Sequence, residues 1–507
     1  MTTPAVLMQR GVQNESQSVE MTTVRLTPNS TSDFQTRFQI PKQGHVLDSN
    51  SALVWTVSWE DYDSTEPLEL VLLKNFSGGL NTIRRARFYI GGREIFESQD
   101  VGHMVHVRNL ARNPDYQEEI LDMELGSVHG YSITSSGKFE LGPDTESKSS
   151  TKVSGADGVK TWYNRYARAL GKYSANPVDN KGVEVTLMLS DIFSALQSIQ
   201  LPMDLEGMRL EIDWETSFGE VAYVASDNSG SITSARKNIS IKNPVLLLDY
   251  LTFDEEARAG LMDVLQNGAV IPYIHTSLSE KVIPANTSAT SVTSDILLAL
   301  QGKLLMKMYV SHRLSDSNTS SVDFAPQIGN GRCRSQRGLN MTYNLYVNDL
   351  AIHDLPVDTA SQQYSFFSMA QQAFASVVPG SVEYNALRES DASATTDSNS
   401  TVYTASGVVL PVSSGITGPK IRDMVSGCQS YIAFDLSKYP QGSSVRGGRV
   451  IPADAGFRSG SSAVILRITQ TGGSANTPEA LPKTITVFTE EVKVLQIRGM
   501  MADVLDA

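Results

Sequence analysis

The sequence predicts an all-β protein made of two similar β-sandwich domains in tandem. Three observations predict it. Short segments of alternating apolar and polar residues recur along the chain, helical patterns are few, and parts of the first half are echoed in the second. The 507 residues are 40% hydrophobic and 19% charged, which supports large cores joined by many turns. One sandwich of this length would exceed the usual size of a single core.

A period of two defines the predicted strands. It is clearest in residues 53–59, 183–189 and 208–215, and it recurs near 304–310, 464–468 and 485–487. Residues 245–248 are apolar at every position, which predicts a strand covered on both faces.

The predicted helices are short and lie between strands. Asp254 caps a helix whose apolar stripe contains Ala257, Leu261, Val264 and Leu265. Ser190 or Asp191 caps a second helix, with Ile192, Leu196 and Ile199, which ends before Pro202. Asp358 or Thr359 opens a third, which extends to residue 374.

Two echoes indicate the duplication. Residues 88–95 (FYIGGREI) and 345–352 (LYVNDLAI) each predict a hairpin with a two-residue turn, and a helical stretch follows each, at 100–110 and 359–374. Residues 187–191 (LMLSD) are echoed by 434–438 (FDLSK). Between the two echoes each half carries a polar stretch, 142–160 or 389–406. Pattern alone therefore predicts an antiparallel sandwich in each half, and the jelly roll is one option among several.

Composition excludes several classes. The net charge of −13 provides no overall basic field for nucleic acid. No apolar run is long enough for a membrane helix, and the first residues lack the apolar core of a signal peptide. Cys333 and Cys428 are too few for a disulfide framework, so we expect a protein made inside the cell with reduced thiols.

The segment at the midpoint, 248–258 (LDYLTFDEEAR), resembles the inter-domain segment of double jelly-roll major capsid proteins. These proteins come from tailless icosahedral DNA viruses: Polinton-like viruses, virophages and the nucleocytoplasmic large DNA viruses. Residues 189–210 are similar to the family's stretch of apolar helix, Leu-Pro and returning strand, and 494–501 to its C-terminal strand and Gly-Met tail. The first 20 residues and the two polar stretches match nothing in the family.

The resemblance implies two tandem eight-stranded jelly-roll barrels with short inserted helices. The expected parts are an N-terminal arm, 1–20, a first jelly roll, 21–252, and a second, 253–507, that starts with a short linker helix. The implied function is a non-enzymatic major capsid protein of the virion, assembled inside the host cell. Its homotrimers would form pseudo-hexagonal capsomers that tile an icosahedral shell.

The implied partners are neighbouring capsomers, penton and minor or cement proteins, with an inner membrane as a further possibility. No cofactor and no sequence-specific nucleic acid binding are expected. The two polar stretches are expected at the outer end of the barrels, where long connections leave the cores undisturbed. The arm is expected to order only in the assembled shell.

Two basic clusters are the candidate contact residues between capsomers. They are Arg84, Arg85 and Arg87 before the first hairpin, and Arg332, Arg334 and Arg337 before the second. Because the rest of the surface is acidic, we favour contact with an acidic neighbouring capsomer over contact with the genome or a membrane. Ordinary loop solvation or salt bridges within the chain remain the simpler alternative.

Other chemistry is weakly supported. His103 and His106 have helical spacing but no third metal ligand nearby, so no metal site is expected. Glu211, Asp213 and Glu215 alternate with core residues, as on a solvated strand face. A carbohydrate-binding sandwich or glycosidase, or another viral structural protein such as a spike, stays open as an alternative.

Overall fold

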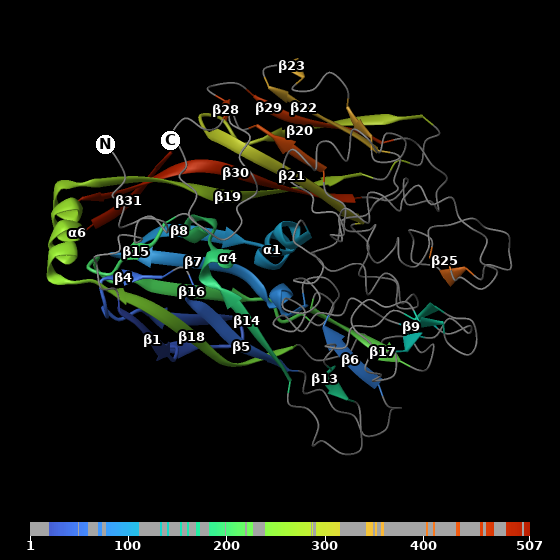
Figure 1. Cartoon of the computed structure of the whole chain (residues 1–507). Helices are drawn as coiled ribbons and strands as arrows, with labels where there is room; N and C mark the ends of the chain where they lie inside the picture. The colour runs from blue at the N-terminus through green and yellow to red at the C-terminus, as the bar shows by residue number, and fades with distance from the viewer. Residues whose placement is uncertain are drawn as a thin grey trace.

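The structure is a computed structural model, shown in Figure 1. It describes residues 20–48, 50–58, 69–73, 78–110, 132–133, 139–140, 153–154, 160–161, 169–172, 182–197, 199–217, 221–226, 239–284, 286, 290–314, 341–347, 350–351, 356–358, 402–403, 409–410, 432–436, 457–459, 463–470, 483–498 and 501–506. None of the helices in these ranges is long and apolar enough to cross a bilayer.

Eight principal strands in the first half form two antiparallel sheets. In chain order they are β1 (Glu20–Leu26), β3 (Gln35–Gln39), β5 (Ala52–Ser58), β7 (Ile83–Ile90), β8 (Arg93–Gln99), β14 (Val183–Met188), β16 (Arg209–Trp214) and β18 (Ser240–Thr252). One sheet has the order β1-β18-β5-β14, and the other β3-β16-β7-β8. This exchange of successive strands between two sheets is the jelly-roll arrangement.

The second half repeats this order. Its strands are β19 (Ala269–Ile283), β20 (Val292–Leu298), β21 (Leu304–Leu314), β22 (Met341–Val347), β23 (Leu350–Ala351), β27 (Ile432–Asp435), β29 (Val464–Gln470) and β30 (Lys483–Arg498). They form the sheets β19-β30-β21-β27 and β20-β29-β22-β23. Strand for strand, the pairing matches the first half, so the duplication predicted from the two echoes is present in the topology.

The remaining elements are short. The sheets are extended by β2 (Ser30–Thr31), β4 (Val46–Leu47), β15 (Leu201–Pro202), β24 (Val357–Asp358), β28 (Phe457–Arg458) and β31 (Met501–Asp506). Smaller sheets are made by β6 (Glu69–Leu73), β13 (Ala169–Lys172) and β17 (Ala222–Ser226), by β9 (Ser132–Ile133), β10 (Phe139–Glu140), β11 (Val153–Ser154) and β12 (Lys160–Thr161), and by β25 (Val402–Tyr403) and β26 (Val409–Leu410). The helices are η2 (Gly78–Thr82), α1 (Val101–Leu110), α4 (Leu189–Ile192), η5 (Ser194–Gln197) and α6 (Glu255–Asn267).

The predicted junction helix is α6, which connects β18 to β19 (Figure 1). The Asp254 carboxylate accepts a hydrogen bond from the Ala257 N–H at 2.9 Å, which satisfies one of the free amides of the first turn. Leu261 and Leu265 are buried against the core, as the predicted stripe requires. The helix ends at Gly268, whose φ of 105° suits a residue without a side chain.

The cap predicted for the second helix is wrong. That helix, α4, begins at Leu189 and takes Ser190 and Asp191 into its first turn, and Met188 before it makes no side-chain cap. The Leu189 N–H is satisfied instead by the backbone oxygen of Ser51 at 2.7 Å, so no capping side chain is needed. Ile192, Leu196 and Ile199 are buried as predicted, although α4 stops at Ile192 and η5 continues after it.

Both predicted hairpins form. β7 and β8 join through Gly91 and Gly92, whose φ angles of 57° and 80° are those a tight two-residue turn demands. β22 pairs with β23 in the same way, with Val347 opposite Leu350. The helix after the first hairpin is α1, whereas the helix predicted after the second lies outside the described residues, apart from Asp358 in β24.

The two barrels share one continuous hydrophobic core, because the β19-β30-β21 sheet packs against the first barrel. Phe96 on β8 contacts Tyr273 on β19 edge to face, with ring centroids 5.3 Å apart. His103 on α1 lies edge to face on Phe488 at 4.9 Å and hydrogen-bonds Ser311 at 3.0 Å. In Figure 1 the four main sheets follow one another in layers, from β1, β18 and β5 to β20, β29 and β22.

Candidate interaction surface

The first predicted basic cluster lies on β7, in the outer face of the β3-β16-β7-β8 sheet. Arg85 and Arg87 point away from the core, since Ala86 and Phe88, which alternate with them along the strand, are buried. Arg85 forms an ion pair with Glu97 on β8. Arg87 holds both carboxylate oxygens of Asp213 on β16, at 3.0 and 3.1 Å. The salt bridges within the chain that the sequence left open are therefore present for these two arginines.

Glu211 lies at the centre of this outer face and is only 4% exposed. Three arginines on three strands surround its carboxylate: Arg37 on β3 at 3.1 Å, Arg209 on β16 at 3.2 Å and Arg87 at 3.4 Å. The prediction of a solvated carboxylate face is wrong for Glu211, because strand alternation sets direction but not what covers a side chain. We call these residues, with Asp213, the Glu211 network.

The network also stabilises the protonated form of Arg87. Burial alone would lower the pKa of Arg87, but the charges of Asp213, then Tyr89 and Glu211, raise it above its ordinary value. Arg87 and Asp213 therefore neutralise one another within the sheet. A catalytic pair of carboxylates would need free groups flanking a cleft, and both Glu211 and Asp213 are already bound by arginine.

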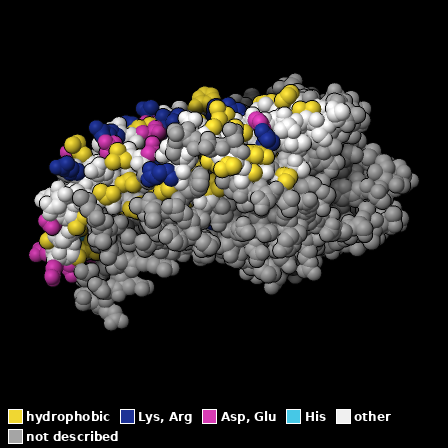
Figure 2. All heavy atoms as spheres, turned by 90° about the horizontal axis from the view of Figure 1, so that it is seen from above, with side chains coloured by type: hydrophobic (Ala, Val, Ile, Leu, Met, Phe, Trp, Pro, Cys, Tyr) yellow, Lys and Arg dark blue, Asp and Glu magenta, His cyan; other side chains and the backbone are white. Residues whose placement is uncertain are grey.

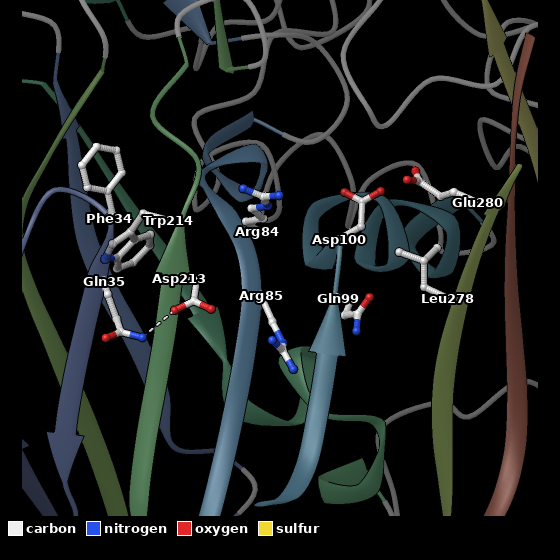
Figure 3. Close-up of a pocket in the computed structure, with 10 residues that line it drawn as sticks. All are labelled: Phe34, Gln35, Arg84, Arg85, Gln99, Asp100, Asp213, Trp214, Leu278 and Glu280. Carbon is white, nitrogen blue, oxygen red and sulfur yellow. Dashed lines mark hydrogen bonds between the residues drawn. The ribbon is translucent and has the colours of Figure 1, made fainter. Parts of the chain in front are cut away.

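An open groove of about 640 Å³ borders the network (Figure 3). Arg84 and Arg85 on β7 and Asp213 on β16 line one side, and Leu278 and Glu280 on β19 of the second barrel line the other. Arg84 is exposed, and no ion pair to it occurs within the described residues. Of the first predicted cluster, Arg84 is therefore the arginine whose charge is open to a partner.

The second predicted cluster cannot be placed beside the first. Arg332, Arg334 and Arg337 lie outside the described residues, as do Cys333 and Cys428. Their assignment as contact residues stays a prediction.

The outer sheet of the second barrel carries a related ion pair with its charges exchanged. Arg37 lies opposite Glu211 in the first barrel, and Asp295 on β20 lies opposite Arg467 on β29 in the second. The Arg467 guanidinium binds Asp295 through two hydrogen bonds, of 2.7 and 2.8 Å. These hydrogen bonds lower the pKa of Asp295 and raise that of Arg467.

The two outer sheets differ in polarity. A cross-strand row of Gln39, Arg209 and Tyr89 in the first barrel corresponds to Leu297, Ile465 and Tyr346 in the second. Leu297 is 60% exposed. Figure 2, seen from the side of the second barrel, shows hydrophobic side chains among charged ones on this face. Such exposed apolar groups are typical of a protein contact surface.

His103 has a structural environment. Its side chain is 1% exposed, and its ring lies between Asp100 at 3.4 Å and Ser311. Within the described ranges, no three histidine, cysteine, aspartate or glutamate side chains are grouped to hold a metal ion.

No protein-family model and no curated protein matches the sequence. Solved structures do match the fold. VP54 of PBCV-1, fitted into a cryo-EM reconstruction of the virophage Sputnik, has 11% identity over 98% of each chain with a TM-score of 0.52. A chain of the Sputnik virophage structure has 12% identity, covers 96% of this chain and 88% of its own, and has a TM-score of 0.53.

The Faustovirus major capsid protein also matches, with 9% identity over 95% of this chain and 91% of its own and a TM-score of 0.50. Likeness at this level of identity establishes the fold: this chain is a double jelly roll, as the junction sequence predicted.

Proposed function

We propose that this chain is a major capsid protein whose homotrimers form pseudo-hexagonal capsomers that tile an icosahedral virion shell. The observation that carries the proposal is that two barrels of identical strand order are packed on one core, in a chain that aligns almost end to end with viral capsid proteins. The two barrels, 21–252 and 253–507, act as two copies of one building block.

Symmetry supplies the physical reason. Three chains with two similar barrels each present six barrels around one axis, so a trimer nearly reproduces sixfold symmetry. A shape of that kind packs against six neighbours with repeated contacts. The mixture of charged and apolar groups on the outer sheets is suited to such contacts.

The role is structural rather than catalytic. The carboxylates that could suggest a glycosidase are bound by arginines in the Glu211 network. The proposed partners are other capsomers, penton proteins and minor capsid or cement proteins. Arg84, exposed at the groove, is the residue of the first basic cluster available to an acidic neighbouring capsomer.

Electron microscopy and mass measurement of the purified protein test the proposal. Three chains of 55.2 kDa give 3 × 55.2, or about 166 kDa, and images should show flat pseudo-hexagonal particles or shells. A monomer that binds sugar would overturn the proposal in favour of a carbohydrate-binding sandwich. Charge reversal at Arg84 should weaken shell assembly while leaving trimers intact, and Arg258→Glu, at an exposed arginine of α6 that does not line the groove, is the comparison and should leave both unchanged.

A further inference from the structure

The contact between the two barrels of one chain indicates how a barrel of one chain can contact a barrel of another chain. The outer face of the β19-β30-β21 sheet is buried by the first barrel: Phe488 and Ser311 are each 1% exposed beneath His103. Thr276 on β19 also hydrogen-bonds Ser194 of η5 at 2.8 Å. One face of a jelly-roll sheet is thus built to receive the helices beside another barrel.

The strand registers identify the matching face of the first barrel. In the first barrel one cross-strand row contains Leu187 on β14, Leu53 on β5 and Leu246 on β18. The corresponding row of the second barrel contains Phe434 on β27, Met308 on β21 and Thr489 on β30. In the next row, whose side chains point to the outer face, Val54 on β5 corresponds to Tyr309 on β21, and Val245 on β18 corresponds to Phe488 on β30. Two residues further along these strands, Thr56 on β5 corresponds to Ser311 on β21.

This matching face is apolar but only partly covered. Val54, Leu247 and Met188 point away from the core of the first barrel and are half-buried. Tyr309, the counterpart of Val54, is buried, whereas Val245 and its counterpart Phe488 are both buried. Arg25 and Glu184 border it with exposed charges. We call the outer face of β1-β18-β5-β14 the docking sheet.

We propose that the docking sheet receives the second barrel of another copy of this chain. The inference rests on the proposed function and names the surface that builds the trimer. The two barrels are similar copies, and within one chain the β8 and α1 side of the first barrel contacts the β19-β30-β21 sheet of the second. The same kind of contact can therefore form between the second barrel of one chain and the first barrel of the next. Repeated head-to-tail contacts close into a ring when the rotation fits.

The side of the second barrel that approaches the docking sheet is identified by the same correspondence. Arg93 at the start of β8 forms an ion pair with Asp503 on β31 of the second barrel at 2.8 Å. The residue at the matching position of β23 is Leu350, which is 72% exposed. An exposed leucine there suits an apolar docking sheet.

Substitution on the docking sheet tests the inference. Val54→Lys and Leu247→Lys place a charge on the apolar face without entering the core, so each variant should fold and lose the trimer. Light scattering should give about 166 kDa for the parent and 55.2 kDa for the variants. Leu297→Lys, an exposed leucine on the opposite outer sheet, is the matched control and should remain trimeric.

Thiol labelling provides a readout that needs no disruption. In a chain with Cys333→Ser and Cys428→Ser, Val54→Cys should react with maleimide about tenfold more slowly in trimers than in diluted monomers. Leu297→Cys should react equally in both.

The outcomes separate the two proposals. A parent chain that is monomeric at all concentrations would refute the proposed function. Trimers that survive Val54→Lys, with an equally reactive Val54→Cys, would refute the docking sheet alone.

Discussion

Acid should destabilise the fold through His275, a histidine on β19 beside a buried carboxylate. The His275 side chain is 15% exposed, and its Nε2 lies 4.0 Å from Glu491 on β30, which is 1% exposed. Glu491 is paired with Lys303 at 2.7 Å and Lys493 at 3.5 Å. Burial, followed by the charges of Lys493 and Lys303, lowers the pKa of His275 to about 3.

The sign and size of the effect follow from linkage. A histidine in the unfolded chain has a pKa of about 6.5, so the unfolded state takes up a proton before the folded state does. The stabilisation is complete above that pH and is lost as the pH falls toward 3. Between pH 7 and pH 5 the free energy of unfolding should fall by about 2 kcal/mol from this group, at about 1.4 kcal/mol per unit below 6.5.

Urea unfolding at pH 7 and pH 5 measures the effect. His275→Gln should remove about 2 kcal/mol of the difference between the two pH values. Ser279→Ala, an uncharged change on the same strand, should leave that difference unchanged. His45 adds to the total, because burial, and then Arg258, also lower its pKa. If His275→Gln loses as much stability on acidification as the parent, the reasoning about the buried cluster is wrong.

Three further effects on stability are expected, each measured by urea unfolding. Asp254→Ala removes the cap of α6 and should cost about 1 kcal/mol, whereas Asp254→Asn should be nearly neutral; equal losses would contradict the cap. Glu211→Gln leaves three arginines around a neutral amide and should cost about 1–3 kcal/mol, more than Glu97→Gln at a more exposed pair; the reverse order would contradict the network. Phe96→Ala opens a cavity between the barrels and should cost about 3–5 kcal/mol, with Phe96→Leu costing less; a loss below about 1 kcal/mol would contradict close packing there.

Much of the fold could be predicted from local sequence patterns. The α6 helix could be predicted because its cap, Asp254, and its apolar stripe lie within one short segment. The strands followed from alternation, and the duplication from two echoes that now lie at matching positions of β7 and β22, and of β14 and β27. Alternation could not choose the jelly roll, because the order of strands in a sheet depends on contacts between distant segments.

The same limit applies to the candidate surface. Arg85 and Arg87 were identified from their clustering, but their partners lie on other strands, and only the pairing of β16 with β3 and β7 brings Glu211 beneath three arginines. The burial of Glu211 was therefore missed. The available signal was that Arg209 stands two residues before Glu211 in the predicted strand 208–215, and so on the same face.

The Arg37–Glu211 pair of the first barrel and the Asp295–Arg467 pair of the second have their charges on opposite strands, which has a consequence for folding. Tandem copies of one barrel risk trading equivalent strands while they fold. If β20 took the place of β3, Asp295 would face Glu211, and if β29 took the place of β16, Arg467 would face Arg37. Either mistake sets like charges opposite each other, which destabilises a strand pair. The reversed pairs thus disfavour the exchange of these strands between the two barrels.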